Sequence, residues 1–421
     1  MTRIAVYTDW VGLDGPMRIG WLHGRQRGSS EIFEFEYEEP ALADSVIGAT
    51  SLDPQIGLFG GPQYPEQRRP QFGAFSDASP DRWGRLLMQR RLERAKRAGT
   101  APASAALHES DYLLGVHDSY RSGALRFKRD DEGPFLDDNK DFVAPPMVRL
   151  RELEAAVKKL EQDGSTPAEI DDSLRILIAP GGSLGGARPK ASVVDPDGGL
   201  WIAKFPSTRD EYDIGGWEMV IHTLGAACGL NFAEGDYKQL GNEHHTFLVR
   251  RFDRVGPEER LHFASAMTLT NHTDGNDCST GVSYLELAEV LITQGANTDQ
   301  DLRELWSRIV FNMLVSNTDD HLRNHGFLLE PGAGWILSPA YDVNPDPHGN
   351  GLKLNVSEAD NAQDLDLARE VAPLFRIKIA DANTIIEDFV SIISRWREVA
   401  ARVGIKTSEH DRMENAFRLA M

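Results

Sequence analysis

Residues 317–324, Asn-Thr-Asp-Asp-His-Leu-Arg-Asn, are the stretch of this sequence whose residue types and spacing best suit chemistry. Asp319 and Asp320 place two adjacent carboxylates there, and either could serve as a base. Apolar residues recur at helical spacing before this stretch, and the apolar run 327–329 after it predicts a short strand. A polar loop between two buried elements is a typical position for catalytic groups, although a capping loop rich in Asn and Asp has the same composition.

The spacing within this loop matches phosphoryl-transfer chemistry. Asp319 and Asn324 lie five residues apart, as in the Asp-x-x-x-x-Asn of a protein-kinase catalytic loop. There the Asp accepts the proton of the substrate hydroxyl and the Asn holds a magnesium ion. Asp342 follows a second apolar segment, which is the place of the metal-binding Asp in the same scheme. A simple turn Asp is the alternative interpretation of Asp342.

Residues 180–190, Pro-Gly-Gly-Ser-Leu-Gly-Gly-Ala-Arg-Pro-Lys, form a glycine-rich segment that leads into an apolar run. Glycine lets backbone N–H groups approach phosphate oxygens closely, and Arg188 and Lys190 add positive charge. The segment is not a Walker A loop, because it lacks Gly-Lys-Ser/Thr and no helix is expected after it. A tight hairpin turn would explain the same glycines.

Further features follow in the order found in protein kinases. Lys204 ends the run Leu-Trp-Ile-Ala-Lys, which resembles the Val-Ala-Ile-Lys strand whose lysine contacts the α- and β-phosphates of ATP. Glu218 lies fourteen residues later, on a helix expected over residues 216–227, and is placed to pair with that lysine. Residues 246–254 form a β-run at the position of the hinge, whose backbone binds adenine. A solvated lysine on an edge strand is the alternative for Lys204.

Length and composition predict an ordinary globular protein with two or three domains, since 41% of the 421 residues are hydrophobic and 26% are charged. The net charge of −20 argues against chain-wide binding to nucleic acid or to an anionic membrane, without excluding a local basic face. Cys228 and Cys278 lack ligand-like spacing, which indicates a reducing cytoplasm and no zinc site. No apolar run approaches the roughly 20 residues that span a bilayer, and the N-terminus reads as a strand rather than a signal peptide. We therefore expect a cytoplasmic protein.

Other segments predict the elements around these motifs. A small sheet is expected within residues 1–60, and a helix over about residues 82–98 carries seven Lys or Arg against one Glu. That helix is either an ordinary solvated face or a contact surface for an acidic partner or DNA. Residues 150–162 predict another helix, and residues 385–399 predict one amphipathic helix near the C-terminus.

Together the motifs resemble the HipA family of type II toxin–antitoxin serine/threonine protein kinases. The resemblance rests on Ser-Leu-Gly-Gly-Ala-Arg-Pro-Lys, Val-x-Arg-Phe-Asp-Arg, Thr-Asp-x-His-x-x-Asn and Tyr-Asp-Val, and it extends over nearly the whole chain. It implies an α+β fold, an atypical bilobal protein-kinase-like fold with an N-terminal α/β subdomain. The implied divisions are an N-terminal subdomain (1–128), a linker (129–149), a kinase N-lobe with the glycine-rich loop and hinge (150–255) and a mostly helical C-lobe (256–421).

The resemblance also implies a role for each motif residue. Asp319 would be the catalytic base, and Asn324 and Asp342 would hold Mg²⁺. Ser183 falls where the family carries an inhibitory autophosphorylated serine, whose phosphate ejects the glycine loop. The residues implied to lie around ATP are Gly185, Gly186, Ala187, Arg188, Pro189, Lys190, Lys204, Glu218, Arg250, Arg251, Phe252, His321, Leu322, Arg323, Asn324, Tyr341 and Asp342. Asp320 stands where some members have Gly and receives no role, and Arg250 occupies a position that can be acidic elsewhere.

The implied activity is ATP- and Mg²⁺-dependent phosphorylation of a Ser or Thr on a cellular protein, with a small HipB-like DNA-binding antitoxin as partner and DNA contacted only through it. Two alternatives stay open. A kinase acting on a small molecule shares the Asp-x-x-x-x-Asn logic, but the N-terminal domain and the Ser-x-Gly-Gly-Ala-Arg-Pro-Lys loop favour a protein kinase. A non-catalytic pseudokinase could bind an antitoxin or DNA through the basic helix, but the retained Lys204, Asp319, Asn324 and Asp342 argue against it.

Overall fold

The chain divides into two compact units, which are described separately below. The computed structural model describes residues 2–27, 30–66, 69–136, 144–162, 166–177, 188–256 and 259–421. The first unit comprises Met1–Thr208 with Asp253–Ala264, and the second comprises Arg209–Phe252 with Ser265–Met421. The finer four-part division expected from the sequence stays a prediction.

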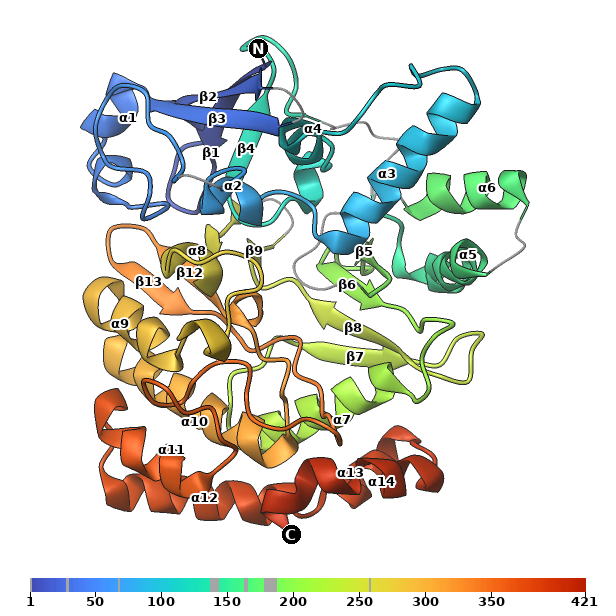
Figure 1. The fold of residues 1–421 in the computed structure, drawn as a ribbon, viewed down its shortest axis with the longest axis vertical. Helices are drawn as coiled ribbons and strands as arrows, with labels where there is room; N and C mark the ends of the chain where they lie inside the picture. Colours follow the sequence, from blue (N-terminus) through green and yellow to red (C-terminus); the bar gives the residue numbers. More distant parts are fainter. Residues whose placement is uncertain are drawn as a thin grey trace. The chain divides into compact units, whose positions relative to one another are not determined.

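An antiparallel sheet of four strands begins the first unit (Figure 1). Its order is β3-β2-β1-β4, and the strands are β1 (Thr2–Thr8), β2 (Met17–Arg27), β3 (Ser30–Tyr37) and β4 (Leu125–Lys128). Strand β1 pairs on both edges, and its side chains Ile4 and Val6 are fully buried. The rings of Phe35 on β3 and Phe75 on α2 (Gly73–Asp77) pack 5.5 Å apart and extend this core. The expected N-terminal sheet is confirmed.

The basic helix of the first unit is α3 (Arg82–Arg97). Asp81 caps its start, since its carboxylate accepts a hydrogen bond from the Gly84 N–H at 2.9 Å. Trp83 is buried, and its Nε1 donates to the carbonyl of Lys190 at 2.9 Å. This bond holds the start of α3 against the first residue of strand β5 (Lys190–Val194).

Strand β5 forms an antiparallel hairpin with β6 (Leu200–Lys204), in which Lys190 lies opposite Lys204. Directly opposed residues project from the same face, so the register places both ammonium groups on one side of the hairpin. The other elements of this unit are α1 (Glu39–Ala43), α4 (Glu109–Leu114), α5 (Leu150–Glu161), α6 (Pro167–Leu177), β9 (Arg254–Val255) and β10 (Glu259–Arg260).

The second unit is built around α10 (Thr298–Val315), which is buried on every side over residues 305–315. Its other helices are α7 (Ile214–Ala227), α8 (Ala266–Leu269), α9 (Tyr284–Gln294), α11 (Leu365–Val371), α12 (Ile379–Ile393), α13 (Trp396–Val403) and α14 (Thr407–Met413). The strands are β7 (Gly235–Lys238), β8 (Thr246–Arg250), β12 (Gly326–Glu330) and β13 (Gly334–Leu337), and β11 (Phe263–Ser265) ends where the unit resumes. Among the described residues, no helix has both the length and the apolar character to cross a bilayer.

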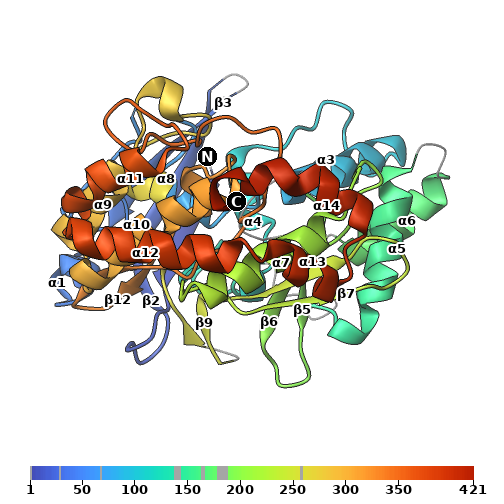
Figure 2. The ribbon, with the colours of Figure 1, turned by 90° about the horizontal axis from the view of Figure 1, so that it is seen from below.

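The C-terminal amphipathic segment differs from the prediction, because residues 385–399 form parts of two helices instead of one. A turn at Ser394 and Arg395 separates α12 from α13. Trp396 is fully buried just after this turn and stacks on Phe417 with ring centroids 4.4 Å apart. The turn also lets α12 pack on α10 while α13 packs on α7 (Figure 2). The apolar periodicity continues across the break, so no local pattern indicates it.

Candidate active site

The catalytic loop predicted from the sequence begins where α10 ends. Ser316 adopts a left-handed conformation (φ 50°, ψ 48°), which stops the helix and turns the chain away. The Ser316 hydroxyl donates to the carbonyl of Ala416 at 2.7 Å, so a segment a hundred residues later fixes this turn. The chain then passes through a 3₁₀ turn over Leu322–Asn324 and enters β12. The loop is therefore held at both ends by buried elements.

The two adjacent carboxylates have opposite environments. Asp319 is exposed, whereas only 2% of Asp320 is exposed. Oδ2 of Asp320 accepts hydrogen bonds from Tyr284 OH at 2.6 Å, Asn312 Nδ2 at 2.8 Å and His325 Nε2 at 2.8 Å. Burial alone would raise the pKa of Asp320, but the charge of His325 and these hydrogen bonds outweigh it and lower the pKa below its ordinary value. Asp320 therefore anchors the loop, and Asp319 is left facing solvent.

Asn324 and Asp342 have the features of metal ligands. Asn324 is buried, and its Nδ2 donates to the Asp319 carbonyl at 3.1 Å. Its Oδ1 is buried too and accepts no hydrogen bond from the described residues. Asp342 has φ 59°, a left-handed conformation that is uncommon for residues with a side chain but that Asp adopts more readily than most. An amide oxygen and a carboxylate are the ligands that Mg²⁺ prefers, so these residues fit that ion.

Hydrogen bonds tie the segment that carries Asp342 to the catalytic loop. Tyr341 OH donates to the Arg323 carbonyl at 2.7 Å. The Asn344 N–H donates to Oδ1 of Asn317 at 3.3 Å. These contacts set the two candidate metal ligands on segments that are joined to each other.

The same segment also contacts the loop beside the candidate base. Oγ1 of Thr318 donates to Asp346 Oδ2 at 3.0 Å, and the Asp346 N–H donates to the Ser316 carbonyl at 3.0 Å. Gly349 lies so close to Thr318 that a Cβ added to it would sit 2.7 Å from Thr318 Cβ and still closer to Oγ1 and Cγ2. The residue before Asp319 is thus packed tightly in place.

An aromatic pair lies next to Asp342, on the hinge side of the second unit. The rings of Phe252 and Tyr341 are 5.4 Å apart and inclined by 36°. Tyr341 and Asp342 also line a small cavity together with Glu218 of α7, which is 4% exposed. Of the predicted site residues of this unit, Glu218, Tyr341 and Asp342 therefore line one cavity, and Phe252 packs against Tyr341.

The arginines of the hinge run have different settings. Arg250 is exposed and its side chain pairs with Glu234 at 2.9 Å, while its N–H donates to the Glu234 carbonyl at 2.8 Å. Arg251 is buried. Within the catalytic loop, the Nε of Arg323 pairs with Asp274 at 3.0 Å. Their expected contacts with nucleotide stay predictions.

Lys190 and Lys204, the candidate phosphate-binding lysines, belong to the first unit. Lys204 is 7% exposed, and Lys190 is in a buried ion pair with Asp81 at 3.2 Å. The side chain of Lys190 is thus engaged at the start of α3. Glu218 belongs to the second unit, so its predicted pairing with Lys204 stays a prediction. Arg188 and Pro189 are described just before β5, whereas Ser183, Gly185, Gly186 and Ala187 lie outside the described residues.

Sequence reasoning missed the residues that hold Asp320. Tyr284 lies 36 positions upstream of Asp320, and nothing in the sequence links the two. Asn312 offered one signal, because it is a lone amide inside the apolar run of α10. A buried amide needs a partner, and the nearest polar loop contained two carboxylates.

Comparison with known protein families matches residues 182–397, about half of the chain, to the HipA-like C-terminal domain. The matched region includes all the motifs from Ser183 to Asp342. The chain belongs to this family. The resemblance inferred from the motifs is confirmed.

Curated relatives of this HipA-like chain carry kinase names. A Haemophilus influenzae protein named "Putative kinase" is 26% identical over 233 residues, which are 51% of this chain and 62% of the relative. "Putative kinase Y4mE" of Sinorhizobium fredii is 27% identical and matches 38% of this chain and 41% of its own length. The matches thus span between about two fifths and three fifths of these relatives. This HipA-like chain is a member of a kinase family.

A solved structure shows the fold of this HipA-like chain over its whole length. The Shewanella oneidensis HipA, HipB and operator DNA complex contains a chain that matches 99% of this one and 95% of its own length, with a TM-score of 0.66. The identity is 18%, so the similarity speaks for the fold alone. The expected α+β fold of the HipA type is confirmed.

Proposed function

We propose that this HipA-like protein is an ATP- and Mg²⁺-dependent kinase that phosphorylates a Ser or Thr hydroxyl of a cellular protein. The observation that best supports this proposal is the arrangement of the catalytic loop. It presents the exposed Asp319 and, five residues later, the buried Asn324, whose Oδ1 accepts no hydrogen bond from the described residues. The neighbouring Asp320 is fully engaged, so Asp319 is the carboxylate available to receive a proton.

The proposed roles follow from these positions. Asp319 accepts the proton of the acceptor hydroxyl, while Asn324 and Asp342 would hold Mg²⁺, which neutralises charge on the transferred phosphoryl group. Phe252 and Tyr341 would contact adenine, and the lysines of the β5–β6 hairpin would contact phosphates. Phosphoryl transfer depends chiefly on positioning and charge, which agrees with the dense hydrogen bonding of this loop.

The decisive test uses radiolabelled ATP with a bacterial lysate as the source of acceptors. Wild-type protein should label protein bands, and Asp319→Asn should lower the labelling rate by about 10² to 10⁴, the usual contribution of a general base. Mg-ATP binding, followed as a thermal shift, should survive in Asp319→Asn. Asp388→Asn is the matched control, because Asp388 is an exposed carboxylate on α12. Wild-type labelling by Asp319→Asn would refute the assignment, and label found only in small molecules would indicate a small-molecule kinase.

Autophosphorylation of Ser183 is the proposed regulation of this activity. Intact-mass measurement after incubation with Mg-ATP should show one added phosphate in the wild type and none in Ser183→Ala. Asp319→Asn should also fail to gain the phosphate, since the proposal assigns the transfer to the protein's own loop. A phosphate that persists in Ser183→Ala would move the modification to another residue.

The proposed partner is a HipB-like DNA-binding antitoxin, through which the protein would contact DNA. The support is the similar Shewanella structure, which is a complex of HipA, HipB and operator DNA. The net charge of −20 fits contact with DNA through a partner better than direct binding. Co-expression with a candidate antitoxin should yield a complex on gel filtration that binds operator DNA, while this protein alone should not shift the DNA.

A further inference from the structure

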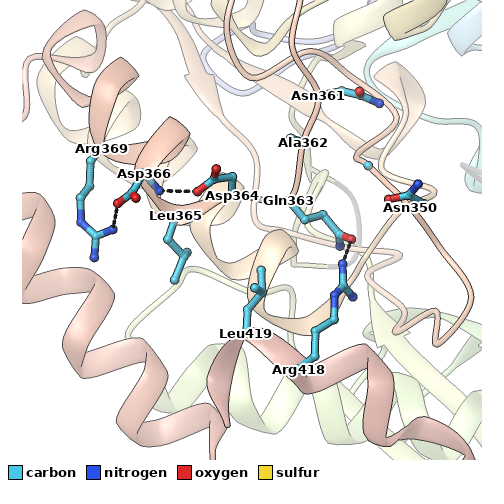
Figure 3. A pocket seen from close by; sticks show the side chains of 11 residues that line it. Asn350, Asn361, Ala362, Gln363, Asp364, Leu365, Asp366, Arg369, Arg418 and Leu419 are labelled. Carbon is cyan, nitrogen blue, oxygen red and sulfur yellow. Dashed lines mark hydrogen bonds and ion pairs between the residues drawn. The ribbon is translucent and has the colours of Figure 1, made fainter.

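The second unit carries an open groove of about 680 Å³ that the proposed transfer chemistry does not use (Figure 3). Its walls come from residues 350–351 and 361–366, from Arg369 of α11, and from Arg418 and Leu419. The last two belong to the 3₁₀ segment Glu414–Ala420. The lining is mixed, with amides, two arginines, two aspartates and two leucines.

Arg418 is the unusual member of this lining. It is half-buried, and its guanidinium donates to Ser316 Oγ at 2.9 Å, to the Asn415 carbonyl at 3.2 Å and to Oε1 of Gln363. Figure 3 shows Arg418 pointing from its 3₁₀ segment to Gln363 across the groove. All three acceptors are neutral, and none of the described carboxylates pairs with Arg418. A half-buried guanidinium with neutral partners favours an incoming carboxylate, which it can bind through its planar fork.

The other charged side chains of the groove do not cancel this preference. Arg369 and Asp366 neutralise each other in an ion pair at 2.7 Å. Asp364 accepts a hydrogen bond from the Asp366 N–H at 2.8 Å and caps α11. Asp364 is exposed, so water and salt screen its charge more strongly than they screen the half-buried Arg418.

The walls of the groove are tied to residues that precede Asp319 in the chain. Asn350, at one wall, directly follows Gly349, which packs on Thr318 beside Asp319. Arg418, at the other wall, donates to Ser316 at the start of the loop. These links make the groove a candidate site for the polypeptide that carries the acceptor hydroxyl.

We propose that the groove binds the segment of the acceptor protein next to its phosphorylated Ser or Thr, and that Arg418 pairs with an Asp or Glu of that segment. This inference rests on the proposed kinase function, because it assigns the groove to the protein acceptor. The proposal predicts that the acceptor protein carries an Asp or Glu beside the modified residue. Arg418 is then a specificity residue, and Asp319 keeps the chemistry.

The test measures peptide binding without ATP, so that it is independent of catalysis. Fluorescein-labelled peptides carry one Ser flanked by glutamates or, in the matched peptide, by glutamines, and fluorescence anisotropy gives each affinity. Wild-type protein should bind the Glu peptide about tenfold more tightly, as expected for one added charge-assisted pair. Arg418→Gln should lose that preference. Arg402→Gln should keep it, because Arg402 is exposed on α13 outside the groove.

Equal affinity of the wild type for the two peptides, or no binding of either, would overturn the inference. Loss of the preference in Arg402→Gln as well would also overturn it. If Arg418→Gln does not fold, Arg418→Lys is measured instead. Lysine keeps the charge, so this variant should keep a reduced preference for the Glu peptide. A lysine variant without preference would count against the charge pair. The radiolabel test of Asp319 is independent of this binding test. A preference for the Glu peptide without phosphate transfer would refute the kinase proposal but would still show that the groove binds acidic peptides.

Discussion

Replacing Asp320 by asparagine separates the structural carboxylate of the loop from the catalytic one. Three donors, from Tyr284, Asn312 and His325, converge on Oδ2 of Asp320 at 2.6 to 2.8 Å. A hydrogen bond to a charged acceptor contributes about 1.5–3 kcal/mol, and one to a neutral acceptor about 0.5–1.5 kcal/mol. The isosteric amide therefore weakens each bond by about 1 kcal/mol, so three bonds should cost about 3 kcal/mol of unfolding free energy.

Urea unfolding followed by tryptophan fluorescence measures this loss. Asp319→Asn is the matched control, because Asp319 is exposed and its replacement should change stability by no more than about 0.5 kcal/mol. The two neighbours should thus give opposite phenotypes, with stability lost at Asp320 and activity lost at Asp319. The reasoning fails if Asp320→Asn unfolds at the wild-type urea concentration, or if both variants are destabilised equally.

The pH dependence of the stability difference between wild type and Asp320→Asn gives an independent check. The pKa of Asp320 is lowered in the folded protein, so its ionised form contributes stability above the ordinary Asp pKa of about 3.9. That contribution is lost as pH falls through the lower folded-state pKa. The stability difference between wild type and Asp320→Asn should therefore be constant near neutral pH and shrink in acid below about pH 4. A difference that grew in acid would contradict the direction of the pKa shift.

Two further experiments test a close contact beside the proposed base and a buried ion pair of the first unit. Gly349→Ala should displace Thr318 beside the proposed base, which should lower kcat by about 10² and the unfolding free energy by about 1–3 kcal/mol. Gly60→Ala is the control and should change neither quantity, because a Cβ at Gly60 meets open space. A normal kcat of Gly349→Ala in steady-state kinetics would disprove the effect of the close contact. In the first unit, a double-mutant cycle of Asp81→Asn and Lys190→Met should give a coupling energy of about 1–3 kcal/mol from thermal or urea unfolding, because both charges are buried. Additive effects would mean that the ion pair contributes nothing of its own.

The sequence predicted those parts of the site that depend on local spacing. The five-residue interval from Asp319 to Asn324, the end of the buried helix before it and the strand after it all follow from short-range patterns. The confirmed fold class came from motif order along the chain. Spacing alone also favoured Asp319 over Asp320 as the candidate base, because only Asp319 has the five-residue interval to Asn324.

The parts of the site that the sequence did not predict depend on contacts between distant segments. Tyr284 approaches Asp320 only through the packing of α9 beside the loop, and the same holds for Gly349 against Thr318. No periodicity marks such pairs, since each partner is an ordinary residue in its own segment. The break before Trp396 is similar, because no Gly or Pro marks it and Trp396 stacks on Phe417 from a distant segment.

The bond from Ser316 to Ala416 has a consequence for the timing of synthesis. The end of α10 is held by the Ala416 carbonyl, 100 positions later, and by Arg418, 102 positions later. At translation rates of about 5–20 residues per second, those contacts become possible roughly 5–20 seconds after Ser316 leaves the peptidyl-transfer centre. For most of that interval the nascent chain already contains Asp319, Asn324 and Asp342 but lacks the anchor of the loop between them. The loop should therefore become ordered only after the segment around Ala416 has been synthesised.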